Sequence, residues 1–335
     1  MELDAALGHD VELAAVPQLA SHAEELGFAA LWTVETRHDP LLPLALVAEH
    51  TQRLRFGTAV AVAFVRSPTV VAHTAWDLAH QSGGRLILGL GTQVRAHVRR
   101  RFAMPWSGEP IAQIRDFVGA VRAVWQSWQS GQQVVYRGAH YNVTLMTPFF
   151  SPPPIAQPQI PIYLAGVGPA MCALAGEIAD GLIVHPMHSR RYLAEVILPA
   201  VAIGAARAGR HPSAVRISAS VLTAIGEKDR AHVREQIAFY ASTPSYREVL
   251  RLHGWEGIGS ELSDLARSGR WPEMPRLVTE AMIDAFAVSG RWGELAEQLH
   301  ERCSGLLDRI TLYRDFGAAG DERGWRRLLA DFPQS

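Results

Sequence analysis

The chain has little cysteine and almost no net charge. Its 335 residues include two cysteines, Cys172 and Cys303, and the formal net charge is −1. These cysteines show no metal-ligand spacing, and a reduced cytoplasm fits them best. A charge this close to zero gives no general attraction to nucleic acid or to a membrane, and we expect neither as a partner.

Long apolar runs and a targeting segment are also missing from the sequence. No stretch reaches the roughly 18 uncharged apolar residues that a membrane span requires. The first ten residues, MELDAALGHD, have no basic start and no apolar run, so we expect them not to act as a signal peptide. We therefore expect a cytoplasmic protein. Hydrophobic residues make up 48% of the chain, which allows a large core in one barrel or two smaller domains.

The sequence is rich in short apolar runs that alternate with longer amphipathic ones. Alternation of this kind predicts parallel strands joined by helices, and eight strands in this length favour a (β/α)₈ TIM barrel. We expect one domain over residues 1–335, with excursions near 93–110, 130–160 and 240–275. The predicted strands cover residues 3–7, 28–34, 55–63, 85–91, 161–168, 181–187, 215–226 and 308–313.

A barrel of this kind binds ligands where its strands end, and five of these ends are rich in glycine, histidine and small residues. Small residues let a large flat ligand and its phosphate approach the backbone. Glu35 follows an apolar strand directly, where a carboxylate is costly unless it is paired or functional. Arg37 and Arg66 are its candidate partners.

Other patterns have ordinary interpretations that compete with functional ones. The Gly89–Gly91 stretch is half of a dinucleotide fingerprint, and its third glycine is missing. His185 and His188 lie on a strand-to-loop turn without a nearby carboxylate or cysteine, so we expect no metal site. The arginines that follow the fourth strand form either a solvated face or a contact for a polyanionic cofactor tail. They are Arg95, Arg99, Arg100 and Arg101.

Five stretches in this order resemble the bacterial luciferase-like monooxygenase superfamily, and within it the oxidoreductases that use the deazaflavin coenzyme F420. The stretches are LWTVETRHDP (31–40), FGTAVAVAFVRSPTVVAHTAWDL (56–78), GGRLILGLGT (83–92), PIYLAGVGPAMCALAGEIADGLIV (161–184) and IDAFAVSGRWGELAEQL (283–299). The resemblance implies hydride transfer between F420 and a small organic substrate. Two alternatives remain open: an FMN-dependent monooxygenase supplied by a separate reductase, and a non-catalytic flavin-binding barrel.

The resemblance also implies a set of site residues. It places a bulge with a non-proline cis peptide at Ala59-Val60, behind the central ring of the cofactor. It assigns acid–base chemistry to His38, oriented by Glu35 or Asp39, with His97 as a competing candidate. The implied cofactor-binding residues are Asp39, Ala59, Val60, Ala61, Thr92, His97, Ala165, Gly166, Val167, Gly168, His185 and Ser189.

The sequence departs from the sugar-phosphate dehydrogenases of that superfamily at two points. Val94 stands where they carry a glutamate, and no Gly-Lys-Gly follows the sixth strand. We therefore leave the substrate class open beyond a small molecule. A homodimer is compatible with the resemblance, and the sequence does not decide it.

Overall fold

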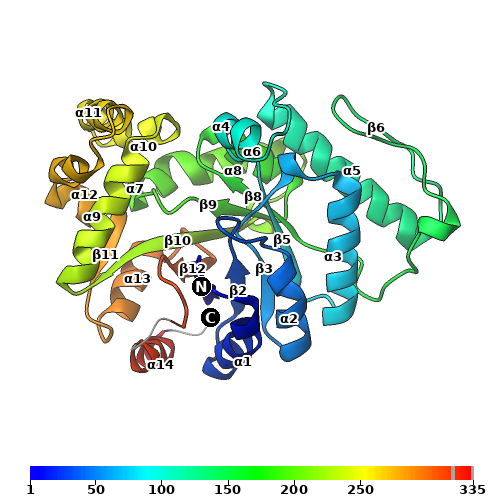
Figure 1. Ribbon diagram of the computed structural model, residues 1–335, viewed down its shortest axis with the longest axis horizontal. Helices are drawn as coiled ribbons and strands as arrows, with labels where there is room; N and C mark the ends of the chain where they lie inside the picture. The colour runs from blue at the N-terminus through cyan, green and yellow to red at the C-terminus, as the bar shows by residue number, and fades with distance from the viewer. Residues whose placement is uncertain (318–320, 333–335) are drawn as a thin grey trace.

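The computed structural model describes residues 1–317 and 321–332. Eight parallel strands close into a barrel in the order β1–β2–β3–β5–β8–β9–β10–β12, and β12 pairs back onto β1. Helices surround this barrel, so the predicted (β/α)₈ fold is confirmed (Figure 1). The barrel strands are β1 (Glu2–Ala6), β2 (Ala30–Thr33), β3 (Arg55–Thr58), β5 (Leu86–Gly91), β8 (Ile162–Gly166), β9 (Gly181–Val184), β10 (Arg216–Ile225) and β12 (Arg309–Leu312).

Four further strands lie outside this ring. β4 (Ala61–Val62) continues the line of β3 and pairs with β5, while β6 (Tyr136–Arg137) and β7 (Asn142–Val143) form a small antiparallel hairpin. β11 (Ala287–Gly290) pairs with the final residues of β10, and the apolar pattern did not indicate it as a strand.

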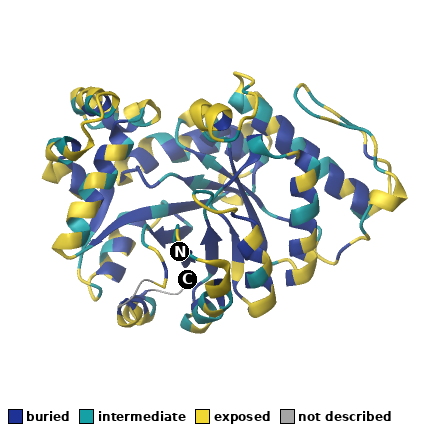
Figure 2. Cartoon of the chain, in the orientation of Figure 1, coloured by how far each residue is buried: buried dark blue, intermediate teal, exposed yellow. Residues whose placement is uncertain are grey.

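The helices cover the barrel and build a lobe beside its mouth. Figure 1 shows α9 to α12 gathered at the left of the molecule, and Figure 2 shows the strands and inward helix faces as buried. The helices are α1 (Val16–Leu26), α2 (Leu42–His50), α3 (Pro68–Ser82), α4 (Arg95–Arg100), α5 (Pro110–Ser130), α6 (Pro169–Ile178), α7 (Arg190–Tyr192), α8 (Leu198–Arg207), α9 (Glu227–Ala241), α10 (Arg247–Leu252), α11 (Glu256–Arg267), α12 (Glu280–Phe286), α13 (Leu295–Cys303) and α14 (Glu322–Asp331).

Local sequence signals set where these helices begin and end. Proline occupies the first turn of α1, α3, α5 and α6, where its missing N–H costs no helical hydrogen bond. Gly27 ends α1 as a left-handed C-cap with φ of 93°. No helix in the described part of the chain is long and apolar enough to cross a membrane.

The inside of the barrel is filled by a buried polar cluster. Arg309 on β12 donates from Nη2 to Asp4 Oδ1 at 2.7 Å and from Nε to Asp4 Oδ2 at 2.9 Å. Trp32 donates from Nε1 to the same carboxylate at 2.8 Å. Its ring also lies 6.2 Å from that of Tyr163, measured between centroids. These bulky side chains occupy the lumen, so a ligand site has to lie beyond them at the end of the strands.

Two glycines allow β3 and β5 to approach closely. A Cβ on Gly89 would lie 1.7 Å from the carbonyl oxygen of Thr58, and a Cβ on Gly57 would lie 2.1 Å from that of Ile87. Real Cβ atoms do not come this close to backbone oxygen. Glycine is therefore required at both positions by packing, because neither has a positive φ.

We expect Gly89→Ala to destabilise the fold by about 3 kcal/mol, because the new methyl group forces the two strands apart. Gly257→Ala is the control: Gly257 is exposed at the start of α11 with no atom near its Cβ position, so alanine should be neutral or stabilise by up to about 1 kcal/mol. Urea unfolding of both variants measures the difference. Equal stability of the two would contradict the close-packing argument.

Candidate active site

The third strand ends in the bend that the sequence singled out. The Ala59-Val60 peptide is cis, as the resemblance predicts. Around it the backbone is firmly held: Ala59 N donates to Thr33 O at 2.7 Å, and the Thr58 hydroxyl donates to Gly89 O at 2.5 Å. Ala59 and Val60 are partly exposed, whereas Ala61 is fully buried. The first two can therefore touch a ligand, and Ala61 can contribute only through its backbone position.

Small residues surround this bend. A Cβ on Gly91 would lie 2.6 Å from Val60 Cγ2 and 3.6 Å from the Cβ of Ala165, so these three residues of neighbouring strands are adjacent. Gly91 is buried beneath Val60, while Ala59, Val60 and Ala165 are partly exposed, so a flat ligand would meet these three small side chains. We call Ala59, Val60, Gly91 and Ala165 the floor of the site.

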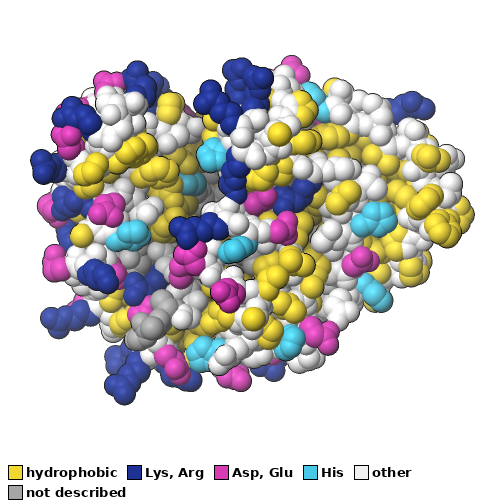
Figure 3. Space-filling model, in the orientation of Figure 1, with side chains coloured by type: hydrophobic (Ala, Val, Ile, Leu, Met, Phe, Trp, Pro, Cys, Tyr) yellow, Lys and Arg dark blue, Asp and Glu magenta, His cyan; other side chains and the backbone are white. Residues whose placement is uncertain are grey.

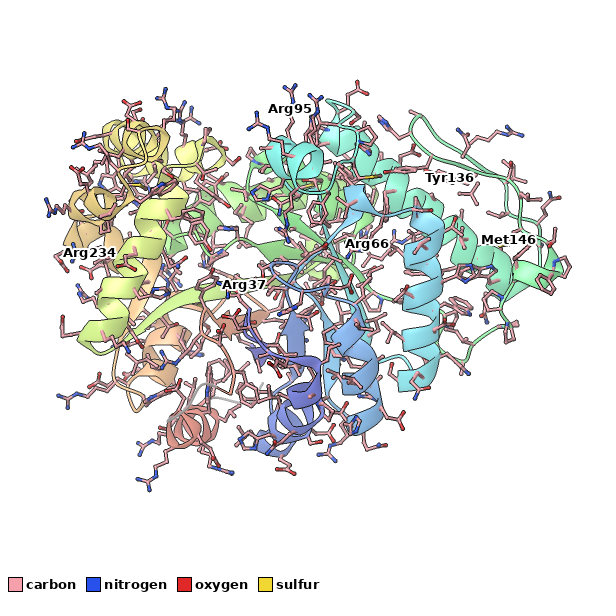
Figure 4. All side chains as sticks on the ribbon, in the orientation of Figure 1. Arg37, Arg66, Arg95, Tyr136, Met146 and Arg234 are labelled. Atoms are coloured by element: carbon pink, nitrogen blue, oxygen red, sulfur yellow. The ribbon has the colours of Figure 1, made fainter. Side chains whose placement is uncertain are left out.

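Glu35 supports the bend from behind. Its Oε2 accepts a hydrogen bond from Val62 N at 2.6 Å and one from Arg66 Nη1 at 2.7 Å, and its side chain is 6% exposed. Arg66, which is labelled in Figure 4, also donates to Asp39 Oδ2 at 2.9 Å. The predicted pairing of Glu35 is thus with Arg66, while Arg37 pairs with Asp10.

Asp39 is the third member of this network. Partial burial alone would raise the pKa of its carboxyl, but hydrogen bonds from Leu41 N, Leu42 N and Arg66 lower that pKa below its ordinary value. Asp39 therefore remains ionised and anchors the start of α2. Both carboxylates are engaged with Arg66, so neither is left as a free acid or base.

The two histidines proposed for acid–base chemistry are exposed. His38 lies in the loop after β2, and His97 lies on α4. Neither ring has a hydrogen-bond partner among the described residues. Thr92, between β5 and α4, is partly buried, and its hydroxyl donates to Gln93 O at 3.2 Å. Because no described residue bonds to either histidine ring, both rings are free to contact a ligand.

A further histidine was missed by the sequence analysis. His9 follows β1, and its Nδ1 lies 2.9 Å from the Thr36 hydroxyl in the loop after β2. Arg101 donates to the carbonyl oxygen of Thr36, so this member of the arginine cluster holds the same loop. The rule applied to the other strand ends would have found His9, because it stands two residues after the end of the first predicted strand.

The turn between β8 and α6 carries Ala165 to Gly168. Gly168 is the N-cap of α6, whose first turn can present backbone N–H groups to an anion. A Cβ on Gly166, the last residue of β8, would lie 2.8 Å from Leu182 Cδ1 and 3.1 Å from Cys172 Sγ, so a larger residue there would require these side chains to shift. Glu248 of α10 reaches to 4.0 Å from the Cβ position of Gly168, which places a carboxylate near this helix end.

The residues that follow β9 are mostly buried. Ser189 caps α7 by accepting a hydrogen bond from Tyr192 N at 3.0 Å, and its hydroxyl also lies 2.8 Å from His253 Nε2. His188 is 1% exposed. Burial and the nearby Arg302 lower the pKa of His188 to about 4. The described residues contain no group of three or more His, Cys, Asp or Glu side chains that could hold a metal.

The space-filling view shows a furrow at the mouth of the barrel. It runs between the lobe of α9 to α12 and the central region that carries α4 (Figure 3). The Arg95 side chain on α4 points outward beside it (Figure 4). The strand ends described above thus open onto a surface that a ligand can reach.

Comparison with known proteins places this architecture in a family. A model of the luciferase-like monooxygenase family matches residues 1–309. An uncharacterized protein of Mycobacterium tuberculosis is 47% identical over 305 residues, which cover 89% of each chain. The F420-dependent glucose-6-phosphate dehydrogenase of Nakamurella multipartita is 30% identical over 311 residues, or 89% of this chain and 83% of that protein.

A solved structure agrees with this placement at the level of the fold. The coenzyme F420-dependent tetrahydromethanopterin reductase of Methanopyrus kandleri superposes with a TM-score of 0.78 at 22% identity, covering 98% of this chain and 97% of the other. The chain belongs to the luciferase-like monooxygenase family, and it is an oxidoreductase of that family.

The buried histidines predict how stability depends on pH. The pKa of His188 in the folded chain, about 4, is below its value of about 6.5 in an unfolded chain. Between these values the unfolded state binds more protons, so stability falls as the pH falls, by roughly 3 kcal/mol for this residue. Burial lowers the pKa of His185 to about 3, and it adds to the same trend.

We expect His188→Gln to reduce the loss of folding stability that accompanies a fall in pH. Urea unfolding at pH 6.5 and pH 4.5 should show a smaller difference for the variant than for the parent chain. His80→Gln, which changes an exposed histidine of α3, should keep the parent's difference. An unchanged slope in His188→Gln would show that His188 is not the group that titrates.

Proposed function

We propose that this protein is an F420-dependent oxidoreductase that transfers a hydride between the deazaflavin and a small organic substrate. The observation that carries the proposal is the floor of small residues around the bend at Ala59-Val60. It places three small, partly exposed side chains, Ala59, Val60 and Ala165, at the mouth of a barrel whose lumen is filled. Support for F420 comes from the relative that shares 30% of its sequence and is named as F420-dependent.

The described residues suit the parts of this cofactor. The floor suits the face of a tricyclic ring, and the turn ending at Gly168 offers backbone N–H groups to a phosphate that lies clear of the Glu248 carboxylate. Arg99 and Arg100 are exposed on α4 and form no ion pair with a described residue. Free cations there suit a polyanionic tail, because charge-assisted contacts need unpaired partners.

The chemistry divides between the cofactor and the chain. A reduced deazaflavin supplies a hydride, and the substrate heteroatom then needs a proton. Histidine suits this proton transfer near neutral pH. We assign it to His38, because the ring is exposed and free of described partners. In this assignment Glu35 does not transfer a proton. It is a positioning residue for the bend, because its carboxylate accepts hydrogen bonds from Val62 N and Arg66.

FMN is the alternative cofactor, and a two-component monooxygenase is the alternative activity. The family includes monooxygenases by its description, and a flat isoalloxazine ring also fits the floor. The two cofactors differ most at the tail, where F420 carries glutamates and FMN ends in its phosphate. The arginines of α4 therefore favour F420.

Titration of the ligand-free protein with the two cofactors tests this proposal. We expect F420 to bind at least about tenfold more tightly than FMN, which corresponds to 1.4 kcal/mol. Arg99→Ala and Arg100→Ala should each weaken F420 by roughly two- to fivefold, more for longer glutamyl tails. Arg137→Ala, on the distant β6 hairpin, is the matched control and should have no effect. Equal or tighter binding of FMN would reject F420 as the cofactor.

The role of His38 is tested once screening has found a substrate. We expect His38→Asn to reduce turnover roughly 10²–10⁴-fold, as removal of a general acid–base group does. Cofactor affinity should stay nearly unchanged, because backbone and shape hold the ring. The same change at exposed His80 is the control. Full activity would remove His38 from the mechanism and turn attention to His97, whereas a large loss of affinity would reassign His38 to binding.

A further inference from the structure

The rim of the barrel has two unlike halves. Ile183 packs inside the lumen against Ile87 and Tyr163, and side chains alternate along a strand, so His185 continues the same face beyond the end of β9. By the same rule, Tyr313 follows Arg309 on the inward face of β12. His185 and Tyr313 therefore face the mouth. Tyr313 follows β12, on the side of the barrel opposite β3 and β5, whereas His185 follows β9, which adjoins β8 and its floor residue Ala165.

Two tyrosines from the helical lobe complete this aromatic side. Tyr240 lies in the last turn of α9, and its ring centroid lies 4.6 Å from that of His185, edge to face. Tyr246 precedes α10. Its ring centroid also lies 4.6 Å from that of His185, and the two ring planes are tilted by 34°. We call His185, Tyr240, Tyr246 and Tyr313 the aromatic wall. Nothing in the sequence indicated these tyrosines, because they come from an excursion without a periodic pattern.

The hydrogen bonds of the wall leave one imidazole donor free. His185 Nδ1 accepts from Met187 N at 3.1 Å, which places the proton of the neutral ring on Nε2. Burial, with a smaller effect from His188, holds the pKa of His185 near 3, so the ring is neutral at physiological pH. Nε2 has no hydrogen-bond partner among the described residues, and His185 as a whole is partly exposed. Tyr240 and Tyr313, in contrast, bond to each other through their hydroxyls at 2.5 Å.

The wall carries no charge of its own. The groups that act on the His185 ring are a neutral histidine, His188, and the rings of Tyr240 and Tyr246. The neighbouring cations along the chain are Arg314, which is paired with Asp229 and Asp321, and Arg247, which follows Tyr246 and is exposed. An anionic group placed against the four rings would lose hydration without a charged partner among them.

We propose that the aromatic wall binds an uncharged, flat carbonyl compound, with His185 Nε2 donating a hydrogen bond to the carbonyl oxygen. This inference rests on the proposed function, because the wall faces the floor where the cofactor ring would lie. The tyrosine faces hold the flat carbon skeleton, and the donor fixes which atom points toward the chain. The substrate class thus differs from the sugar phosphate named for the Nakamurella relative.

The test uses acetophenone labelled with ¹³C at its carbonyl and protein saturated with oxidised F420, which cannot reduce the probe. We expect acetophenone to bind and its carbonyl resonance to move downfield, as hydrogen bonding to oxygen requires. Benzoate, the charged analogue, and cyclohexyl methyl ketone, which is not flat, should bind more weakly. Equal binding of benzoate, or no downfield shift, would overturn the inference.

Variants separate the donor from the wall. His185→Phe should abolish the carbonyl shift and weaken binding roughly three- to tenfold, whereas His185→Gln restores a donor and should recover part of both. Tyr246→Ala should weaken binding and leave the carbonyl shift in place, because it removes only a ring face. His80→Phe is the control. A carbonyl shift that persists in His185→Phe would remove His185 as the donor.

A second readout needs no ligand and covers the case in which His185→Phe does not fold. ¹⁵N NMR of the parent protein should show His185 neutral and protonated on Nε2 at pH 6. A protonated ring, or a proton on Nδ1, would overturn the donor assignment. Failure of F420 itself to bind rejects the proposed function, whereas F420 binding without acetophenone binding rejects only this inference.

Discussion

The ion pair between Asp4 and Arg309 is the interaction on which the rest of the barrel depends. It joins the first strand to the last inside the lumen, and both side chains are at most 1% exposed. A buried pair of this kind is tolerated only when its hydrogen bonds are satisfied, and Trp32 Nε1 supplies a further donor. Loss of one partner would leave an uncompensated charge in the centre of the fold.

The filled lumen determines where a site can form. Trp32, Tyr163 and Arg309 block the barrel interior, so a ligand can enter only beyond them, at the ends of the strands. On β3, β5 and β8 the inward positions above this plug are small, as at Gly91 and Ala165. On β9 and β12 they are His185 and Tyr313. The division of the rim is therefore a continuation of the same side-chain alternation that fills the lumen below it.

Much of this arrangement could be predicted from the sequence, and the remainder depends on tertiary contacts. The eight barrel strands were predictable because buried parallel strands are short apolar runs bounded by glycine and proline. The bend at Ala59-Val60 was predicted through family resemblance alone, since no local pattern specifies it. The partner of Glu35 could not be decided between Arg37 and Arg66, because both are near in the expected loops and only packing separates them. The role of Tyr240 and Tyr246 could not be predicted for a similar reason, because their positions depend on how the lobe packs against the barrel.

The lobe links the two sides of the mouth through one short segment. Tyr246 lies in the aromatic wall, and Glu248, two residues later, brings its carboxylate near Gly168 at the start of α6. A carboxylate there interacts favourably with the helix end, and it occupies the surroundings that a cofactor phosphate would share. Arg251 lies 3.5 Å from Glu248 and offers it another partner within the same helix. Because Tyr246 and Glu248 are so close in the chain, a change in the position of α10 alters the wall and the phosphate-side turn together. The substrate side and the cofactor side of this site are thus joined by sequence proximity as well as by the shared mouth of the barrel.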